Sequence, residues 1–266
     1  TSIVREAEQL VGQGVRELNL IAQDTTSYGK DLKNENTSMS SLLEQLDQLE
    51  GTFWIRVLYT HPAHIDDQVI ETLAHAEHVV PYIDVPLQHI SDCVLSAMGR
   101  RVDAASTRRT IEKLRERLPN VTLRTTFLVG HPGETEEAFQ ELYDFVEKTE
   151  FDRMGVFPFS PEPGTPSAKM ADQAVAQEIA EERRNALLAL QQDISLRKNR
   201  NLVNTTLTTL AVDQQADGQY IGRTWADAPE MDNFVYFTGD EECLERGFNE
   251  VKIRQAYPYD LEGEQV

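Results

Sequence analysis

The stretch 125–135, Thr-Thr-Phe-Leu-Val-Gly-His-Pro-Gly-Glu-Thr, has the residue types of a ligand-binding turn. An apolar run at 127–129 ends in Gly130, and the apolar spacing of a helix begins after Thr135. Gly130 and Gly133 would let the backbone approach a ligand where a Cβ atom would collide, and the proline between them fixes the turn. An alternative interpretation is a plain strand-to-helix turn, in which Thr135 caps the helix.

Polar loops follow three other apolar runs, at 23–29, 60–62 and 86–89. In parallel α/β proteins, ligands bind at the edge where the carboxyl ends of the strands meet. The loops therefore indicate one site shared by several strands.

Helical and strand patterns alternate over residues 1–200. Apolar runs typical of strands occur at 15–22, 53–59, 79–85, 121–129 and 153–159, with helical stripes between them. Because helices of this length connect parallel strands by right-handed crossovers, one parallel sheet is predicted. The expected fold is α/β, a (β/α) barrel with its chemistry at the carboxyl edge. A doubly wound open sheet is the structural alternative.

A different pattern follows a long helix, which is predicted at 173–198. Short alternating strands are predicted at 205–212, 220–224, 234–237 and 251–256. They indicate a small antiparallel β-barrel, and we divide the chain into domains 1–200 and 201–266. The second domain has 13 acidic and 4 basic side chains.

The whole chain is strongly acidic, with a net charge of −20 and a pI near 4.6. Nucleic-acid affinity depends on cations that neutralise phosphates, so direct tRNA binding is disfavoured and a basic partner is favoured. The sequence has no run of about 18 apolar residues, so no membrane span is predicted.

Cysteines and histidines give no metal site in the sequence. Cys93 and Cys243 lie far apart without a CxxC pattern, which is typical of reduced thiols in a cytoplasmic protein. Two histidine pairs are three residues apart but lack an evident third ligand: His61 with His64, and His75 with His78.

Four polar motifs stand at the ends of predicted strands. They are Gln-Asp-Thr-Thr at 23–26, Val-Pro-Leu-Gln-His at 85–89, Gly-His-Pro-Gly-Glu at 130–134 and Ser-Pro-Glu-Pro-Gly-Thr at 160–165. The four motifs occur in the same order in the radical S-adenosylmethionine methylthiotransferases, and the chain resembles this family. Residues 220–230 resemble part of the family's TRAM domain. The resemblance implies a partial TIM-like (β/α) radical-SAM barrel that lacks its first strand, followed by an OB-like TRAM barrel that binds the substrate.

The resemblance also implies S-adenosylmethionine as a cofactor, with the turn at 130–134 beside its adenine. The residues then expected to line the cofactor or substrate are Gln23, Asp24, Gln88, His89, Arg124, Thr126, Gly130, Pro132, Gly133 and Glu134. The guanidinium of Arg124 could bind a carboxylate in bidentate fashion. No side chain is assigned a catalytic role, since radical abstraction of hydrogen needs no general base or nucleophile.

The family's CxxxCxxC motif, which ligates the radical-generating cluster, is not in this sequence. Three thiolates must converge on one cluster, and Cys93 and Cys243 cannot supply them. We expect two 4Fe–4S clusters and a reductant in the complete enzyme, no cluster ligated by this chain, and no activity from this chain alone. The chain is therefore expected to be a fragment.

Within the family, the chain most resembles members that methylthiolate the β-carbon of an aspartate on a small-subunit ribosomal protein. The acidic domain at 201–266 fits such a basic protein better than RNA. One alternative is a tRNA adenosine methylthiotransferase. Another is a non-radical (β/α)-barrel enzyme with an appended binding module, working through carboxylates or a metal.

Overall fold

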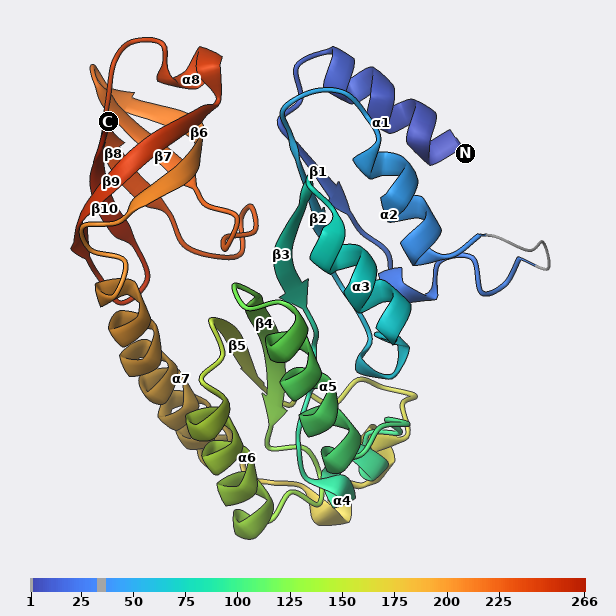
Figure 1. The fold of residues 1–266 in the computed structure, drawn as a ribbon. Helices are drawn as coiled ribbons and strands as arrows, with labels where there is room; N and C mark the ends of the chain where they lie inside the picture. Colours follow the sequence, from blue (N-terminus) through green and yellow to red (C-terminus); the bar gives the residue numbers. More distant parts are fainter. Residues whose placement is uncertain (1, 33–36) are drawn as a thin grey trace.

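The computed structural model describes residues 2–32 and 37–266. Its larger part is a parallel five-stranded sheet whose strands lie in the order of the sequence (Figure 1). They are β1 (Glu17–Leu20), β2 (Trp54–Val57), β3 (Val79–Asp84), β4 (Thr122–Val129) and β5 (Arg153–Pro158). A doubly wound sheet reverses its strand order, so that alternative is wrong and the (β/α) barrel type is confirmed.

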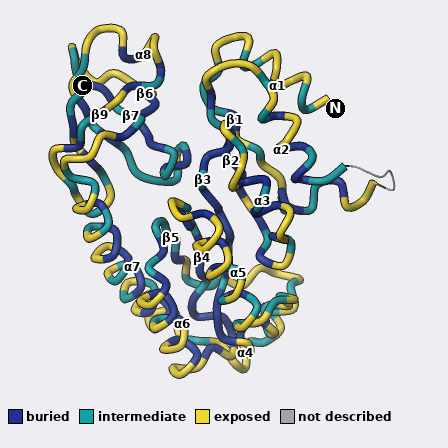
Figure 2. The backbone as a smooth tube through the Cα atoms, in the orientation of Figure 1, coloured by how far each residue is buried: buried dark blue, intermediate teal, exposed yellow. Residues whose placement is uncertain are grey.

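Because the strand order never reverses, right-handed crossovers put the connecting helices on one face of the sheet. The helices of this part are α1 (Ser2–Gly12), α2 (Met39–Asp47), α3 (Asp67–His75), α4 (Asp92–Ala97), α5 (Ala104–Arg117), α6 (Glu136–Thr149) and α7 (Gln177–Arg200). Short 3₁₀ turns occupy Thr25–Ser27, Pro62–His64, Ser167–Lys169 and Ala171–Gln173. The main core lies between the strands and these helices, and Figure 2 shows many residues of the strands as buried.

Local signals explain where several helices begin. Asp66 caps α3 by accepting the Val69 N–H at 2.9 Å, and Thr135 caps α6 by accepting the Ala138 N–H at 3.2 Å. Such caps satisfy backbone donors that the first helical turn leaves without partners. The plain turn interpretation of 130–135 was therefore right about the cap.

The second part is a closed barrel of five strands. They are β6 (Thr206–Ala216), β7 (Gln219–Arg223), β8 (Val235–Thr238), β9 (Phe248–Ala256) and β10 (Leu261–Gln265), with α8 (Cys243–Arg246) between β8 and β9. The sequence prediction missed β10 and called the barrel antiparallel throughout, whereas β8 and β10 pair in parallel. An odd number of strands cannot close by antiparallel pairs alone, so one parallel pair is required.

The small barrel lies at the amino ends of β1–β3, on the far side from the loops that follow the strands (Figure 1). Its loop 224–233 reaches back to the sheet, and α7 runs along β5 toward it. Within the two described ranges, none of the helices is at once long enough and apolar enough for a membrane span.

Candidate functional site

Side chains of β4 alternate between two faces of the sheet. Leu123, Phe127 and Val129 are buried in the core beneath the helices, while Arg124 and Thr126 point to the helix-free face. We call the helix-free face the inner face. Its end at the strands' carboxyl termini is the open end, and its other end, where loop 224–233 lies, is the closed end.

Gln88 at the open end has a backbone conformation that side chains rarely adopt, with φ +69°. Its N–H donates to the Thr126 carbonyl at 2.9 Å, and its carbonyl accepts the Leu128 N–H at 2.8 Å. These bonds fix Gln88 beside β4 in spite of the strain, and strained residues held this firmly cluster at functional sites. The structure thus brings Gln88 and Thr126, two of the predicted residues, together.

The turn at 130–134 is held by Glu134. Its carboxylate accepts the Gly130 N–H at 2.7 Å and binds Arg183 of α7 at 2.9 Å. Burial raises the pKa of Glu134, and Arg183 opposes that shift. Gly130 and Pro132 line a cavity of about 320 Å³ beside α7.

Both glycines of this turn approach protein. A Cβ on Gly130, at φ +76°, would lie 2.3 Å from the Ala180 Cβ of α7. One on Gly133 would lie 3.0 Å from a side-chain oxygen of Gln173. Both glycines were predicted to allow close approach of a ligand, and that role stays a prediction. In the structure, Gly130 lies close to α7, and Gly133 lies close to Gln173 in the turn before α7.

His89 is buried next to this turn, with 1% of its surface exposed. Its Nδ1 accepts the Ser91 N–H at 3.0 Å, so the proton of the neutral ring is on Nε2. That atom is 3.9 Å from a Glu134 oxygen, too far for a hydrogen bond. Burial, with His131 and Arg183 adding to it, lowers the pKa of His89 to about 4.

Asp24 is the centre of a compact polar cluster after β1. Its carboxylate accepts hydrogen bonds from Thr26 at 2.6 Å and Ser27 at 2.5 Å, and it contacts His64 Nδ1 at 2.6 Å. Burial would raise its pKa, but the bonds from Ser27, Thr26 and His64 together lower it to about 2. The neighbouring Gln23 is exposed.

Arg124 lies near the start of β4 and points toward the closed end, away from the other predicted residues. It pairs with Asp84 at 2.8 Å and with Asp232 of loop 224–233 at 3.4 Å. The expected carboxylate partner of Arg124 is therefore part of the protein.

Loop 224–233 closes the inner face with contacts that sequence analysis missed. Arg56, fully buried, donates to the Trp225 carbonyl at 2.7 Å. Tyr82 donates to Asp232 at 2.5 Å, and Arg153 pairs with Asp227 at 2.5 Å. No local sequence signal predicts such pairs, because the partners are at least 74 residues apart.

One open-end residue was also missed. Tyr59, which follows β2, has φ +57° and donates its N–H to an Asp84 oxygen at 2.9 Å. Asp84 therefore links the strained backbone at the open end to Arg124 at the closed end. The only sequence signal was an aromatic residue just before the Thr60 turn.

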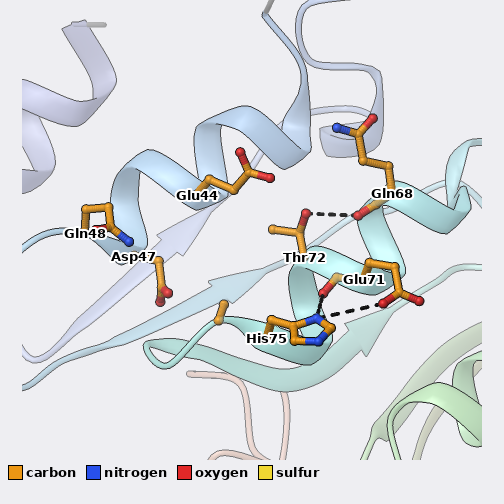
Figure 3. A pocket seen from close by; sticks show the side chains of 8 residues that line it. Glu44, Asp47, Gln48, Gln68, Glu71, Thr72 and His75 are labelled. Atoms are coloured by element: carbon orange, nitrogen blue, oxygen red, sulfur yellow. Dashed lines mark hydrogen bonds and ion pairs between the residues drawn. The ribbon is translucent and has the colours of Figure 1, made fainter.

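A separate groove of about 310 Å³ lies between α2 and α3 in the helix layer (Figure 3). Glu44 and Asp47 line it from α2, and Glu71 and His75 line it from α3. The Nδ1 atom of His75 is hydrogen-bonded to the Glu71 carbonyl at 2.8 Å. Within residues 2–32 and 37–266, no three His, Cys, Asp or Glu side chains are grouped to hold a metal ion.

Two family models match this chain. Residues 1–146 match the radical SAM superfamily, and residues 206–266 match the TRAM domain. The chain is 44% identical over 265 residues to the ribosomal protein uS12 methylthiotransferase RimO of Acetivibrio thermocellus, covering 99% of this chain and 58% of that protein. The RimO of Alkaliphilus oremlandii is 43% identical over 264 residues, covering 98% and 60%.

The chain thus spans about three fifths of the length of these curated relatives. A solved structure with a similar fold is the radical S-adenosylmethionine methyltransferase TsrM from Kitasatospora setae. It is 21% identical with a TM-score of 0.51, covering 62% of this chain and 30% of that one. Since the superfamily model covers more than half of its residues, this chain belongs to the radical SAM superfamily.

Proposed function

We propose that this chain is part of a radical S-adenosylmethionine methylthiotransferase that modifies a ribosomal protein. The observation that carries the proposal is its identity of 43–44% to two proteins named as uS12 methylthiotransferases, over almost all of its length. In the reaction, one C–H bond of the substrate is replaced by a C–SCH₃ bond. We further propose that this carbon is the β-carbon of an aspartate, and that the enzyme acts in the cytoplasm.

The open end offers polar groups that fit the nucleoside part of S-adenosylmethionine. Gln88, in the loop after β3, and Thr126 of β4 are both half-buried, and the Gln88 N–H donates to the Thr126 carbonyl. We propose that their amide and hydroxyl groups contact the same ligand. His89 and Glu134 are buried, and they would fix the turn that borders the cofactor without touching it. The bound cofactor, once reduced, supplies the radical that removes hydrogen from an unactivated carbon.

The iron–sulfur clusters do not fit the residues present. Cys93 is exposed on α4, whereas Cys243 is buried in the small barrel. A cluster of this superfamily's type needs three converging thiolates, so we propose that its ligands lie outside these 266 residues. We propose that the ligands of the second cluster also lie outside these residues, and that a reductant supplies electrons to the first cluster.

The cofactor proposal is tested by calorimetric titration of the chain with S-adenosylhomocysteine. Thr126→Val removes one hydroxyl and keeps the β-branched shape, so binding should weaken by about tenfold. Thr208→Val on the exposed side of β6 is the matched control and should leave binding unchanged. Equal affinity of all three proteins would contradict a cofactor site at the open end.

The substrate proposal predicts that the small barrel attracts a basic protein. Glu241, Glu242 and Glu245 are exposed around α8, and reversing all three to lysine should weaken binding of purified uS12 at low salt by about tenfold. The same binding measured with tRNA tests the alternative substrate, since the reversal should strengthen any RNA affinity. Unchanged affinity for uS12 would rule out docking through this surface.

The alternative of a non-radical barrel enzyme makes a different prediction. A longer polypeptide that includes cluster ligands, supplied with reductant, would then leave uS12 unmodified. The methylthiotransferase proposal expects mass spectrometry to find a methylthio group in place of one hydrogen on an aspartate.

A further inference from the structure

A polar cavity of about 240 Å³ lies between β5, α7 and loop 224–233. Gly155 and Phe157 line it from β5, and Gln191 and Ser195 line it from α7. Asn233 and Tyr259 come from the small barrel. The cavity therefore lies where the small barrel meets the sheet, at the side of the inner face.

Three buried polar atoms in the cavity wall have no hydrogen-bond partner among the residues that the structure describes. They are Gln191 Oε1, Ser195 Oγ and Asn233 Nδ2. Gln191 and Ser195 are each only 3% exposed. Buried polar groups without partners are rare in native proteins, because each costs about 1–3 kcal/mol. Three in one cavity point to a ligand that supplies the missing bonds.

The orientation of Gln191 is fixed by the protein. Its Nε2 donates to the Phe151 carbonyl at 2.9 Å, which leaves Oε1 as an acceptor without a partner in a residue that lines the cavity. Asn233 Nδ2 is a donor, and the Ser195 hydroxyl can donate or accept. The three atoms thus offer one acceptor, one donor and one group that is either.

Each charged group in the cavity wall already has a partner of opposite charge. The pairs are Arg124 with Asp232 at 3.4 Å, Arg153 with Asp227 at 2.5 Å, and Lys198 with Asp152 at 2.5 Å. A bound anion or cation would have to compete with these pairs. The charge balance therefore favours an uncharged polar ligand.

We propose that this cavity binds an uncharged amide group of a polypeptide. The amide N–H would donate to Gln191 Oε1, and the amide carbonyl would accept from Asn233 and Ser195. Phe157 is 57% exposed and Tyr259 is 45% exposed, so both give apolar surface to the flanking chain. The identification of the polypeptide as the enzyme's substrate, on its way from the small barrel to the open end, rests on the proposed function.

The test is an NMR titration of the chain with four small probes. Acetamide represents an Asn or Gln side chain, N-methylacetamide represents a peptide bond, and acetate and methylammonium carry the two charges. Either amide should shift the side-chain NH₂ signals of Gln191 and Asn233 saturably, and the two ions should not. No shift with either amide, which would mean a water-filled cavity, overturns the proposal, as does a stronger response to either ion.

Two variants separate binding from folding. Ser195→Ala removes a hydroxyl that has no partner, so the thermal midpoint should not fall, yet acetamide affinity should drop by about threefold to tenfold. Gln191→Leu should abolish acetamide binding, while Gln192→Leu on the exposed side of α7 should keep it. Unchanged affinity in both cavity variants would overturn the proposal. Because these measurements need neither cluster nor turnover, they stand or fall apart from the methylthiotransferase assignment.

Discussion

The two ends of the inner face are built in different ways. At the open end, polar groups are fixed by partners within the sheet domain, as when Glu134 accepts the Gly130 N–H and pairs with Arg183 of α7. At the closed end, they are fixed across the whole chain, as when Tyr82 donates to Asp232 at a separation of 150 residues. Contacts within the sheet domain leave Gln88 and Thr126 half-buried at the open end, whereas contacts with the small barrel accompany the full burial of Arg56 and Tyr82 at the closed end.

This difference changes the interpretation of the small barrel. Arg56 is fully buried, and the side chains of Arg124 and Arg153 are 15% and 14% exposed. All three have partners in loop 224–233. A buried cation is costly unless it is paired. The small barrel is therefore a structural part of the sheet domain's closed end, in addition to any role in binding.

The largest effect is expected from breaking the closed end. Asp227→Ala leaves the largely buried Arg153 without its carboxylate and removes the acceptor for the Thr224 hydroxyl. The free energy of unfolding should fall by about 3–5 kcal/mol, measured by urea denaturation. Glu241→Ala, an exposed carboxylate of the same barrel, should change it by less than about 0.5 kcal/mol.

A second substitution tests the reason for that loss. If the unpaired guanidinium is responsible, Arg153→Met should recover much of the stability of Asp227→Ala. A loss below about 1 kcal/mol in Asp227→Ala, or no recovery in the double variant, would show that the closed end is not held by this pair.

The same contrast explains what could be predicted from the sequence. The apolar run at 127–129 predicted the end of β4, and the residues around 130–135 predicted the turn and the Thr135 cap, since these signals are local. The partners of Arg124 could not be predicted, because a guanidinium pairs with whichever carboxylate the fold brings to it. The sequence shows only that residue 124 carries a positive charge. Its position beside Asp84 and Asp232 is set by the fold.

The missed strand β10 has a physical cause as well. Leu261–Gln265 reads Leu-Glu-Gly-Glu-Gln, with one apolar side chain and a glycine, which is unlike a strand. Gly263 is required there because a Cβ would lie 2.6 Å from the Lys252 carbonyl oxygen. Barrel closure overrides the weak strand propensity of this segment.

At the open end, Gly130→Ala should have the next largest effect. Alanine must adopt φ +76°, and its Cβ would meet the Ala180 Cβ of α7 at 2.3 Å. Strain of about 1–2 kcal/mol and overpacking of about 1–3 kcal/mol should lower the free energy of unfolding together. Thermal or urea denaturation measures the change.

A second glycine with a similar backbone conformation separates the cost of backbone strain from the cost of overpacking. Gly99 has a similar φ of +71°, but a Cβ there would meet nothing within 4 Å. Gly99→Ala should therefore cost only the strain, about 1–2 kcal/mol. Ala180→Gly should be less harmful in the Gly130→Ala background than in the native chain, and simple additivity of the two would exclude the predicted contact with α7.

The buried imidazole of His89 makes stability depend on pH. Its pKa is lowered to about 4 from 6.5, mainly by burial, so between these values the unfolded chain takes up a proton that the native protein does not. The free energy of unfolding should therefore fall as pH decreases from 6.5 to about 4, by up to about 3 kcal/mol in total.

His89→Asn isolates this contribution. The asparagine Oδ1 can replace Nδ1 as acceptor for the Ser91 N–H, but it does not titrate. The stability difference between the native chain and the variant should change across pH 4 to 6.5 and stay constant above pH 7. A constant difference throughout would mean that the pKa of His89 is the same in the folded and unfolded protein.

The smallest effect is expected at Asp24, where the hydrogen bonds are local and part-exposed. Its lowered pKa of about 2 contributes stability above the unfolded value near 3.8, and that contribution is lost as pH falls toward 2. Solvent screening should limit the contribution to less than about 1 kcal/mol. Ser27→Ala removes one hydrogen bond to the carboxylate, so the pKa of Asp24, followed by carboxyl NMR, should rise toward 3.8. If the pKa of Asp24 is unchanged in Ser27→Ala, the Ser27 hydroxyl does not form a stable hydrogen bond with the carboxylate. The open end would then be less ordered at Asp24 than at Glu134.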